Sequence, residues 1–242
     1  MSVAQFDHLT DDFLSALSIG GGGISALADA CVRVLPVRRA AILMRERDAG
    51  LQPWCASDGV AVLVETVQTT LGQGPAVEAV TQGVPVLLAD LAASGERWPG
   101  FAAELARSER IGHPRISGPM VAVPLHLGAV RLGALDLYGE HPGLPRPAMI
   151  SAGLHIADLV TAQLVAGAAQ PGRGVPRWRD QPLTSGVIHQ AAGMVIGQLG
   201  IRAADAYARL RAYAFAHGMS LAEVAESVVA NRIRFDADAD AD

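Results

Sequence analysis

The segment GAAQPGRGVPRWRDQP, residues 167–182, constrains the fold of this chain more than any other feature. It contains three prolines, three glycines and three arginines. Neither a helix nor a strand is expected to continue through it, because proline removes a backbone donor and glycine weakens regular structure. Strongly patterned sequence lies on both sides. We therefore predict two folded units, residues 1–167 and 183–235, joined by a linker at 168–182 and followed by an acidic tail at 236–242.

The composition is that of a folded protein, because half of the 242 residues are hydrophobic. No uninterrupted apolar run approaches the roughly 20 residues that span a bilayer, and the N-terminus MSVAQFDHLTDDFL lacks the basic start of a signal peptide. Cys31 and Cys55 are too few for a disulfide framework and have no cysteine or histidine partner at metal-ligand spacing. We expect a cytoplasmic protein with no membrane contact and no metal.

The formal net charge of −5 is unevenly distributed. Residues 1–170 carry 11 arginines and 16 acidic residues, whereas residues 171–234 carry 8 arginines and 4 acidic residues. The C-terminal unit with its linker is therefore basic, which suits a polyanionic partner. The tail, with Asp236, Asp238, Asp240 and Asp242, is interpreted as a disordered solubilising end; the alternative is that it competes electrostatically with a polyanionic ligand for the basic surface.

Before the linker, the pattern mixes helices and strands. We predict helices over 5–18, 24–35, 60–71, 101–109 and 146–165, and strands over 38–45, 54–57, 85–90, 120–127 and 130–138. The last two strands are separated by Gly128 and Ala129, a hairpin spacing, and their alternation predicts a sheet with one core face. The glycine run 20–23 lacks the lysine of a phosphate-binding loop and is interpreted as a helix break. The expected fold is α+β, an antiparallel sheet flanked by helices.

After the linker, the pattern is purely helical. We predict helices over 185–199 and 203–217 and a third that begins at Ser220, where Ser220 and Glu223 make a capping box. Gly200 and Gly218 end the first two helices. Three short helices bury little surface alone, so this all-α unit is expected to dock on a neighbour or to dimerise.

The first unit resembles a GAF domain, a bacterial sensor module. The resemblance covers about residues 10–167 and is carried by GQGPAVEAV at 72–80, PVLLADLAASGERWPGF at 85–101 and VPLHLGAVRLGALDLY at 123–138. In these motifs Gly133 and Pro124 are expected to shape strands and Trp98 to pack, so they specify fold rather than ligand. GAF pockets bind cyclic nucleotides, haem, tetrapyrroles or nothing; no cofactor is predicted, and the GAF ligand is unknown.

The second unit resembles an ANTAR domain, a three-helix RNA-binding module of bacterial antitermination regulators. The matching positions are Ala191, Gly193 and Met194, then Ala206, Leu210, Arg211 and Ala214, and finally Leu221, Val224 and Ala225. The resemblance implies binding of paired hairpins in nascent messenger RNA, usually by a dimer, so that a transcription terminator does not form. Many family members have a lysine where this chain has Ala192, so a cationic group that would approach the RNA is missing there.

We predict that RNA contacts nine residues of this unit. Small residues let an RNA base come close, and guanidinium or aromatic planes stack on unpaired bases. The residues are Ala191, Ala192, Gly193, Met194, Arg202, Arg209, Arg211, Tyr213 and Arg232. The alternatives are that the small residues pack against a neighbouring helix, that the arginines form a solvated face, and that Tyr213, with His217, belongs to the core.

The two resemblances imply a non-enzymatic antitermination regulator. The GAF domain would receive a signal from an upstream protein or a small molecule, and ANTAR domains paired in a homodimer would bind hairpin RNA. The alternative is a ligand sensor or interaction protein whose ANTAR unit serves dimerisation or docking, with weak or no RNA binding. GAF-type methionine sulfoxide reductases use several cysteines, which argues against that reaction here, and the scattered histidines offer no catalytic pair.

Overall fold

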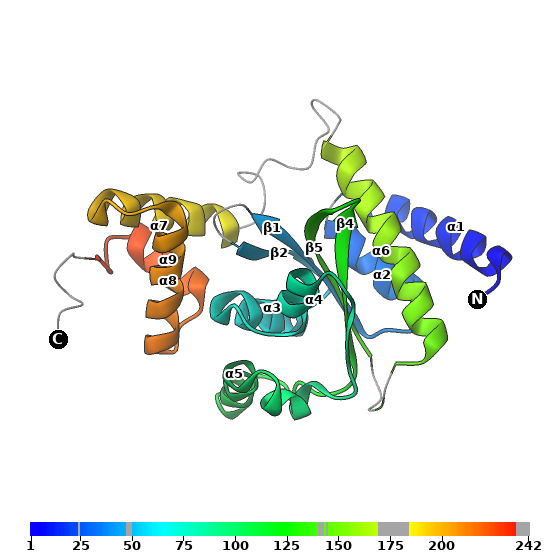
Figure 1. Ribbon diagram of the computed structural model, residues 1–242, viewed down its shortest axis with the longest axis horizontal. Coiled ribbons are helices and arrows are strands. Elements are labelled where there is room, and N and C mark those ends of the chain that lie inside the picture. The colour runs from blue at the N-terminus through cyan, green and yellow to red at the C-terminus, as the bar shows by residue number, and fades with distance from the viewer. Residues whose placement is uncertain (24, 47–49, 140–142, 144, 169–183, 236–242) are drawn as a thin grey trace.

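The computed structural model describes residues 1–23, 25–46, 50–139, 143, 145–168 and 184–235. The tail 236–242 and all of the linker except Ala168 lie outside the described residues. The described residues form an α+β unit followed by a unit of three helices (Figure 1). The N-terminal helix and the C-terminal helices lie at opposite ends of the molecule, with the sheet between them (Figure 1).

The first unit is built on a five-stranded antiparallel sheet with the order β2-β1-β5-β4-β3. The strands are β1 (Arg39–Glu46), β2 (Gly50–Ala56), β3 (Val86–Leu88), β4 (Met120–Leu127) and β5 (Val130–Tyr138). Strands β4 and β5 form the predicted hairpin, and Gly128 at its turn has a φ of 59°. Gly133 lies so close to β1 that a Cβ there would be 1.9 Å from the carbonyl oxygen of Leu43. Only glycine permits this pairing.

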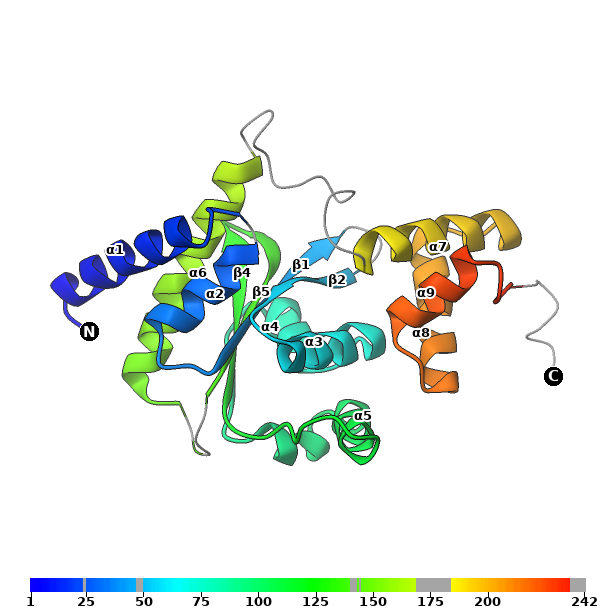
Figure 2. The same ribbon diagram turned by 180° about the vertical axis from the view of Figure 1, so that it is seen from behind.

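Helices cover both faces of the sheet (Figures 1 and 2). One face carries α1 (Val3–Ile19), α2 (Ser25–Val34) and α6 (Pro147–Ala168), and the other carries α3 (Gly59–Leu71), α4 (Pro75–Gln82) and α5 (Pro99–Arg110). The sequence predicts one core face, which is wrong. Strand β4 is buried at six consecutive positions, because Val121 and Val123 pack under the first set of helices and Met120 and Ala122 under the second.

The predicted α+β class is confirmed, with two short helices that the sequence pattern did not indicate. These are α4, which lies between Gly74 and Gly83, and the 3-10 helix η1 (Leu91–Glu96). The helix break at residues 20–23 is confirmed, since Gly21 and Gly22 have φ values of 85° and 67°. Trp98 is buried and packs edge-on against Phe101, with ring centroids 6.3 Å apart.

Helix α6 departs from the expectation that no segment could span a bilayer. By length and composition alone, residues Pro147–Gly167 are sufficient to cross a membrane. Counting apolar runs misses this, because His155 and Asp158 interrupt the sequence. In the structure the helix packs on the sheet and places Ile156, Val160 and Leu164 in the core. Its buried face is that of a core helix.

The second unit consists of α7 (Thr184–Leu199), α8 (Ala203–His217) and α9 (Leu221–Val229). These agree with the three predicted helices. The capping box is present in full, since the Ser220 hydroxyl accepts from the Glu223 amide and the Glu223 carboxylate accepts from the Ser220 amide. The core includes Ile188, Val195, Leu210, Val224 and Val228. It is separate from the cores beside the sheet.

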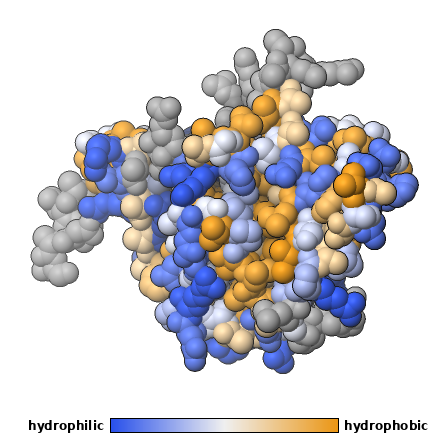
Figure 3. Space-filling view, turned by 45° about the vertical axis from the view of Figure 1, so that its right-hand side comes forward, coloured by the Kyte–Doolittle hydropathy of each residue, from blue (hydrophilic) through white to orange (hydrophobic). Residues whose placement is uncertain are grey.

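The molecular surface is not uniformly polar. Figure 3 shows hydrophobic residues over a broad area in the middle of one face, bordered by hydrophilic ones. Exposed large hydrophobic side chains occur in both units, among them Leu154 of α6 and Phe215 of α8. Apolar surface is therefore available for contact with other molecules.

Candidate functional site

The small residues of α7 point in different directions. Ala191 and Ala192 are fully buried in the core of the three-helix unit. The unit's own helices enclose both side chains, as the helix-packing alternative expects, and RNA contact at these positions stays a prediction. Gly193 is exposed, and a Cβ added there would meet no atom within 4 Å. Met194 is partly buried against the same core. Helix packing thus explains the two alanines but leaves Gly193 unexplained.

Two of the predicted arginines share one face of α8 with Tyr213. Arg202, at the N-cap, and Arg209 are seven residues apart, which is close to two helical turns, and Tyr213 follows one turn later. The Arg202 side chain is 86% exposed, and its Nε donates to Asp205 Oδ2 at 2.9 Å. An exposed pair of this kind contributes little to stability and remains accessible to another anion. This face is the candidate RNA-binding surface.

Tyr213 already has aromatic partners within its own unit. Its ring stacks on the ring of His217, with centroids 3.8 Å apart and planes 13° apart. It also meets Phe235 edge-on at 5.5 Å and packs partly against the core. Tyr213 therefore lies at the edge of the core, as one alternative predicted, and also beside the arginine face where stacking on an RNA base was predicted.

Arg211 lies apart from this face. It is two positions from Arg209, and residues at that spacing point to nearly opposite sides of a helix. It lines a cavity of about 330 Å³ with Arg45 and Arg131 of the first unit. Burial lowers the pKa of the Arg211 guanidinium, because it disfavours the charged form. The nine predicted residues therefore do not form one continuous surface.

Arg232, the last of the predicted residues, follows α9 and is exposed to solvent. Its Nη2 donates to the hydroxyl of Ser227 at 3.4 Å, a long hydrogen bond. A contact of this length is weak, so Arg232 stays a predicted rather than an observed RNA contact.

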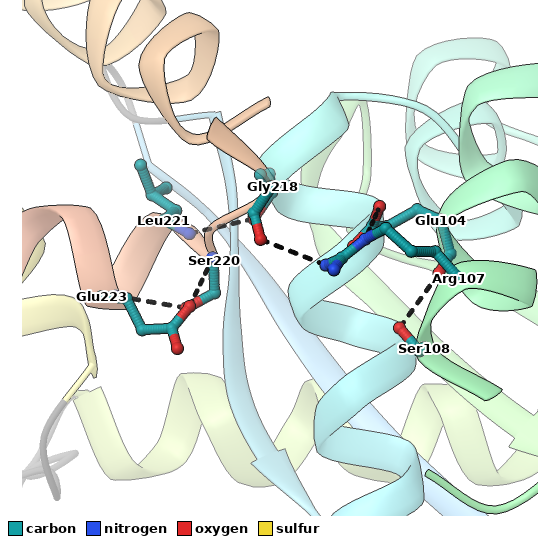
Figure 4. A network of polar contacts seen from close by, with 8 residues as sticks. Glu104, Arg107, Ser108, Gly218, Ser220, Leu221 and Glu223 are labelled. Carbon is teal, nitrogen blue, oxygen red and sulfur yellow. Dashed lines mark hydrogen bonds and ion pairs between the residues drawn. The ribbon is translucent and has the colours of Figure 1, made fainter. Parts of the chain in front are cut away.

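Two side chains of the first unit hydrogen-bond to the backbone between the end of α8 and the start of α9. Arg107 of α5 donates from Nη2 to the carbonyl of Gly218, the residue after α8, at 3.2 Å (Figure 4). The hydroxyl of Thr70 on α3 accepts from the amide of Leu221, the first residue of α9, at 3.3 Å. Helix ends leave carbonyls and amides without partners in their own helix, and here another unit supplies partners. The expected docking of the small unit on a neighbour is thus seen within the chain.

A buried polar network lies in the core of the first unit. Gln68 donates from Nε2 to both Glu65 Oε2 and Asp136 Oδ2, each at 2.8 Å, and Tyr138 hydrogen-bonds to Glu65. Burial raises the pKa of Glu65 well above its usual range and that of Asp136 to about 7. The two carboxyls are far apart in sequence, so spacing gives no sign of the pair. In the fold they are a titratable element of the core.

The remaining candidate groups of the first unit are inert or dispersed. Cys31 is fully buried, Cys55 packs against the same core, and burial raises the pKa of both thiols. Both side chains are therefore held as thiols rather than as reactive thiolates. Among the residues that the structure describes, no group of three or more His, Cys, Asp or Glu side chains could hold a metal ion.

The geometry defines a small helical domain, with arginines on one face of α8, docked on an α+β domain. Residues 179–229 match the family model of the ANTAR domain. The chain therefore carries an ANTAR domain, as its sequence motifs predict. The match begins in the predicted linker and ends with α9. No curated protein sequence matches the chain.

Solved structures similar to the chain include GAF domains. The GAF domain of an Acinetobacter phosphoenolpyruvate-protein phosphotransferase has 14% identity and a TM-score of 0.48, covering 71% of this chain and 99% of that one. The GAF domain of the Coxiella burnetii phosphotransferase has 12% identity and a TM-score of 0.46, covering 66% and 96%. A free methionine-R-sulfoxide reductase from Neisseria meningitidis has 13% identity and a TM-score of 0.45, covering 69% and 93%.

The residues that join the units were not predicted from the sequence. Thr70 and Arg107 belong to α3 and α5, and their partners Leu221 and Gly218 lie 151 and 111 residues away along the chain. No local pattern connects such positions.

Proposed function

We propose that this protein is a signal-responsive RNA-binding regulator that acts in the cytoplasm by transcription antitermination and has no enzymatic activity. The observation that carries the proposal is the ANTAR domain at residues 179–229, with the exposed Arg202 and the half-buried Arg209 on one face of α8. Guanidinium groups on a helix face bind RNA phosphates and stack on unpaired loop bases. The RNA partner is a hairpin, which two ANTAR domains of a homodimer engage together.

The docking contact supports a route for the signal. A change in the sensor unit that moves α3 or α5 alters the partners of Gly218 and Leu221, and with them the position of the whole ANTAR domain. The input is a small molecule or an upstream protein that favours one arrangement of the units. Such an input acts only through its different affinity for the two arrangements.

Crosslinking the full-length protein to RNA in its host cells, followed by sequencing of the bound RNA, tests the proposal. The expected result is a shared hairpin consensus upstream of terminators. Two results together would contradict antitermination through RNA: the amount of RNA recovered equals that of an uncrosslinked control, and the recovered sequences share no hairpin.

A salt titration of binding to such a hairpin tests the arginine face. Arg209→Ala is expected to weaken binding and to lower the slope of log affinity against log salt by about 1, the contribution of one phosphate contact. Arg33→Ala, an exposed arginine on α2 in the other unit, is the matched control and keeps the wild-type slope. An unchanged slope in Arg209→Ala would remove Arg209 from the RNA-binding surface.

The second candidate function is a sensor or interaction protein whose ANTAR domain serves docking. It is favoured by the hydrogen bonds from Arg107 to Gly218 and from Leu221 to Thr70, and by the burial of Ala192 where many family members have lysine. No binding to any hairpin from the protein's own transcripts at low salt would decide for this function.

A further inference from the structure

A cavity of about 420 Å³ lies between the two units. Helices α3 and α5 of the first unit form one side of it, and the end of α8 with the turn into α9 forms the other (Figures 1 and 4). A cavity of this size is within the range of small-molecule sites in proteins, and such sites are frequent where two domains meet.

Three large hydrophobic side chains at this cavity are exposed to solvent. Val62 of α3 is 50% exposed, Ile111 at the end of α5 is 62% exposed, and Phe215 of α8 is 66% exposed. They come from three elements and from both units, and all three line the same cavity. Single exposed apolar residues are ordinary, whereas several around one hollow favour the binding of apolar surface.

The Arg and Glu side chains that line this cavity already have hydrogen-bond partners within the protein. Arg107 donates from Nε to Glu104 Oε2 at 2.8 Å and from Nη2 to the carbonyl of Gly218 (Figure 4). Glu223 accepts from the amide of Ser220 at 2.7 Å in the capping box. A charged ligand would have to break one of these contacts or lose its hydration without replacement. The rest of the lining combines these apolar side chains with a few uncharged polar groups, among them Thr66 and Ser108, and with the imidazole of His113. It therefore suits an uncharged ligand better than an ionic one.

We propose that this cavity binds an uncharged, largely aromatic small molecule, held between Val62 and Ile111 of the first unit and Phe215 of the ANTAR domain. Because the contacts come from both units, an occupied cavity stabilises their docked arrangement. The site lies between the units rather than within the sensor fold. Binding of this ligand requires no RNA, so the inference stands or falls separately from the proposed function.

The test uses Nile red, an uncharged aromatic dye whose fluorescence rises in apolar surroundings, titrated with the full-length protein. Saturable binding of one dye per chain is expected. Phe215→Ala and Ile111→Ala should each weaken it about fivefold or more, because each removes apolar contact area. Val130→Ala is the matched control, since Val130 is 60% exposed at the start of β5 and does not line the cavity.

Three outcomes would overturn the proposal. The first is no saturable binding of Nile red to the wild-type protein. The second is the same dye affinity in Phe215→Ala, Ile111→Ala and Val130→Ala as in the wild type. The third concerns charge: anilinonaphthalene sulfonate, an anionic aromatic dye, should bind this cavity at least about fivefold more weakly. If the anionic dye binds as tightly as Nile red, and if Phe215→Ala abolishes this binding, the cavity does not select an uncharged ligand. All three substituted side chains are exposed, so the variants are expected to fold.

Discussion

The fold requires glycine at position 133 but not at position 193, and substitution separates the two cases. Gly133→Ala would place a Cβ 1.9 Å from the Leu43 carbonyl oxygen, so we expect the free energy of unfolding to fall by about 3 kcal/mol or more. Gly193→Ala meets nothing within 4 Å on an exposed helix face and should raise it by about 0.5–1 kcal/mol. Urea unfolding followed by circular dichroism measures both. A loss of stability in Gly193→Ala would show that the glycine serves the fold.

The buried carboxyl pair makes stability depend on pH. Burial raises the pKa of Asp136 to about 7 in the folded protein, above its value of about 3.9 in an unfolded chain. A carboxyl shifted in this direction stabilises the fold at low pH, and the contribution is lost as the pH rises from about 4 through 7. Asp136→Asn removes this titration and keeps an acceptor for Gln68. The melting temperature of the variant minus that of the wild type should therefore be larger at pH 8 than at pH 5. Parallel pH profiles would contradict this.

At the scale of elements, α7 shows why its missing lysine is not simply a missing surface charge. Ala192 is buried between the helices of the ANTAR domain, so Ala192→Lys places an ammonium group in an apolar core. We expect a loss of about 3 kcal/mol in unfolding free energy and no gain in RNA affinity. Gln190→Lys adds the same charge on the exposed side of α7 and should leave stability within about 0.5 kcal/mol. Chemical denaturation of both variants makes the comparison. Tighter RNA binding by a fully stable Ala192→Lys would contradict the burial argument.

Most helices and strands follow from local sequence, and the exceptions have local causes. Helix α8 ends at Gly218 in the left-handed conformation, and α9 begins with the Ser220 capping box, so both boundaries are encoded within a few residues. Helix α4 is eight residues long and lies between two glycines, too short to show a helical period. The second buried face of the sheet was missed because β4 is apolar at adjacent positions, a pattern that does not show which side faces solvent.

At the scale of the whole molecule, the first unit hydrogen-bonds to the ends of α8 and α9 where the ANTAR domain docks on it. Thr70→Val keeps the shape of the side chain and removes the acceptor for the Leu221 amide. We expect hydrogen exchange of the amides at the α8–α9 junction to become about fivefold faster or more, because a buried amide loses its partner. Thr66→Val is the matched control on the same helix, since the Thr66 hydroxyl donates to the carbonyl of Val62 within α3. Equal exchange in both variants would show that the docking does not depend on Thr70.

The sequence by itself determined most helices and strands of this protein, the three-helix ANTAR motif and the types of side chain that could contact RNA. It did so because caps, glycines and apolar periodicity act over a few residues. Only the tertiary structure decided which of those residues remain accessible. It buried Ala191 and Ala192, separated Arg211 from Arg209, and brought Thr70 and Arg107 to the ends of α8 and α9. These outcomes depend on contacts between positions more than a hundred residues apart or on the packing of whole helices, and no local pattern records either.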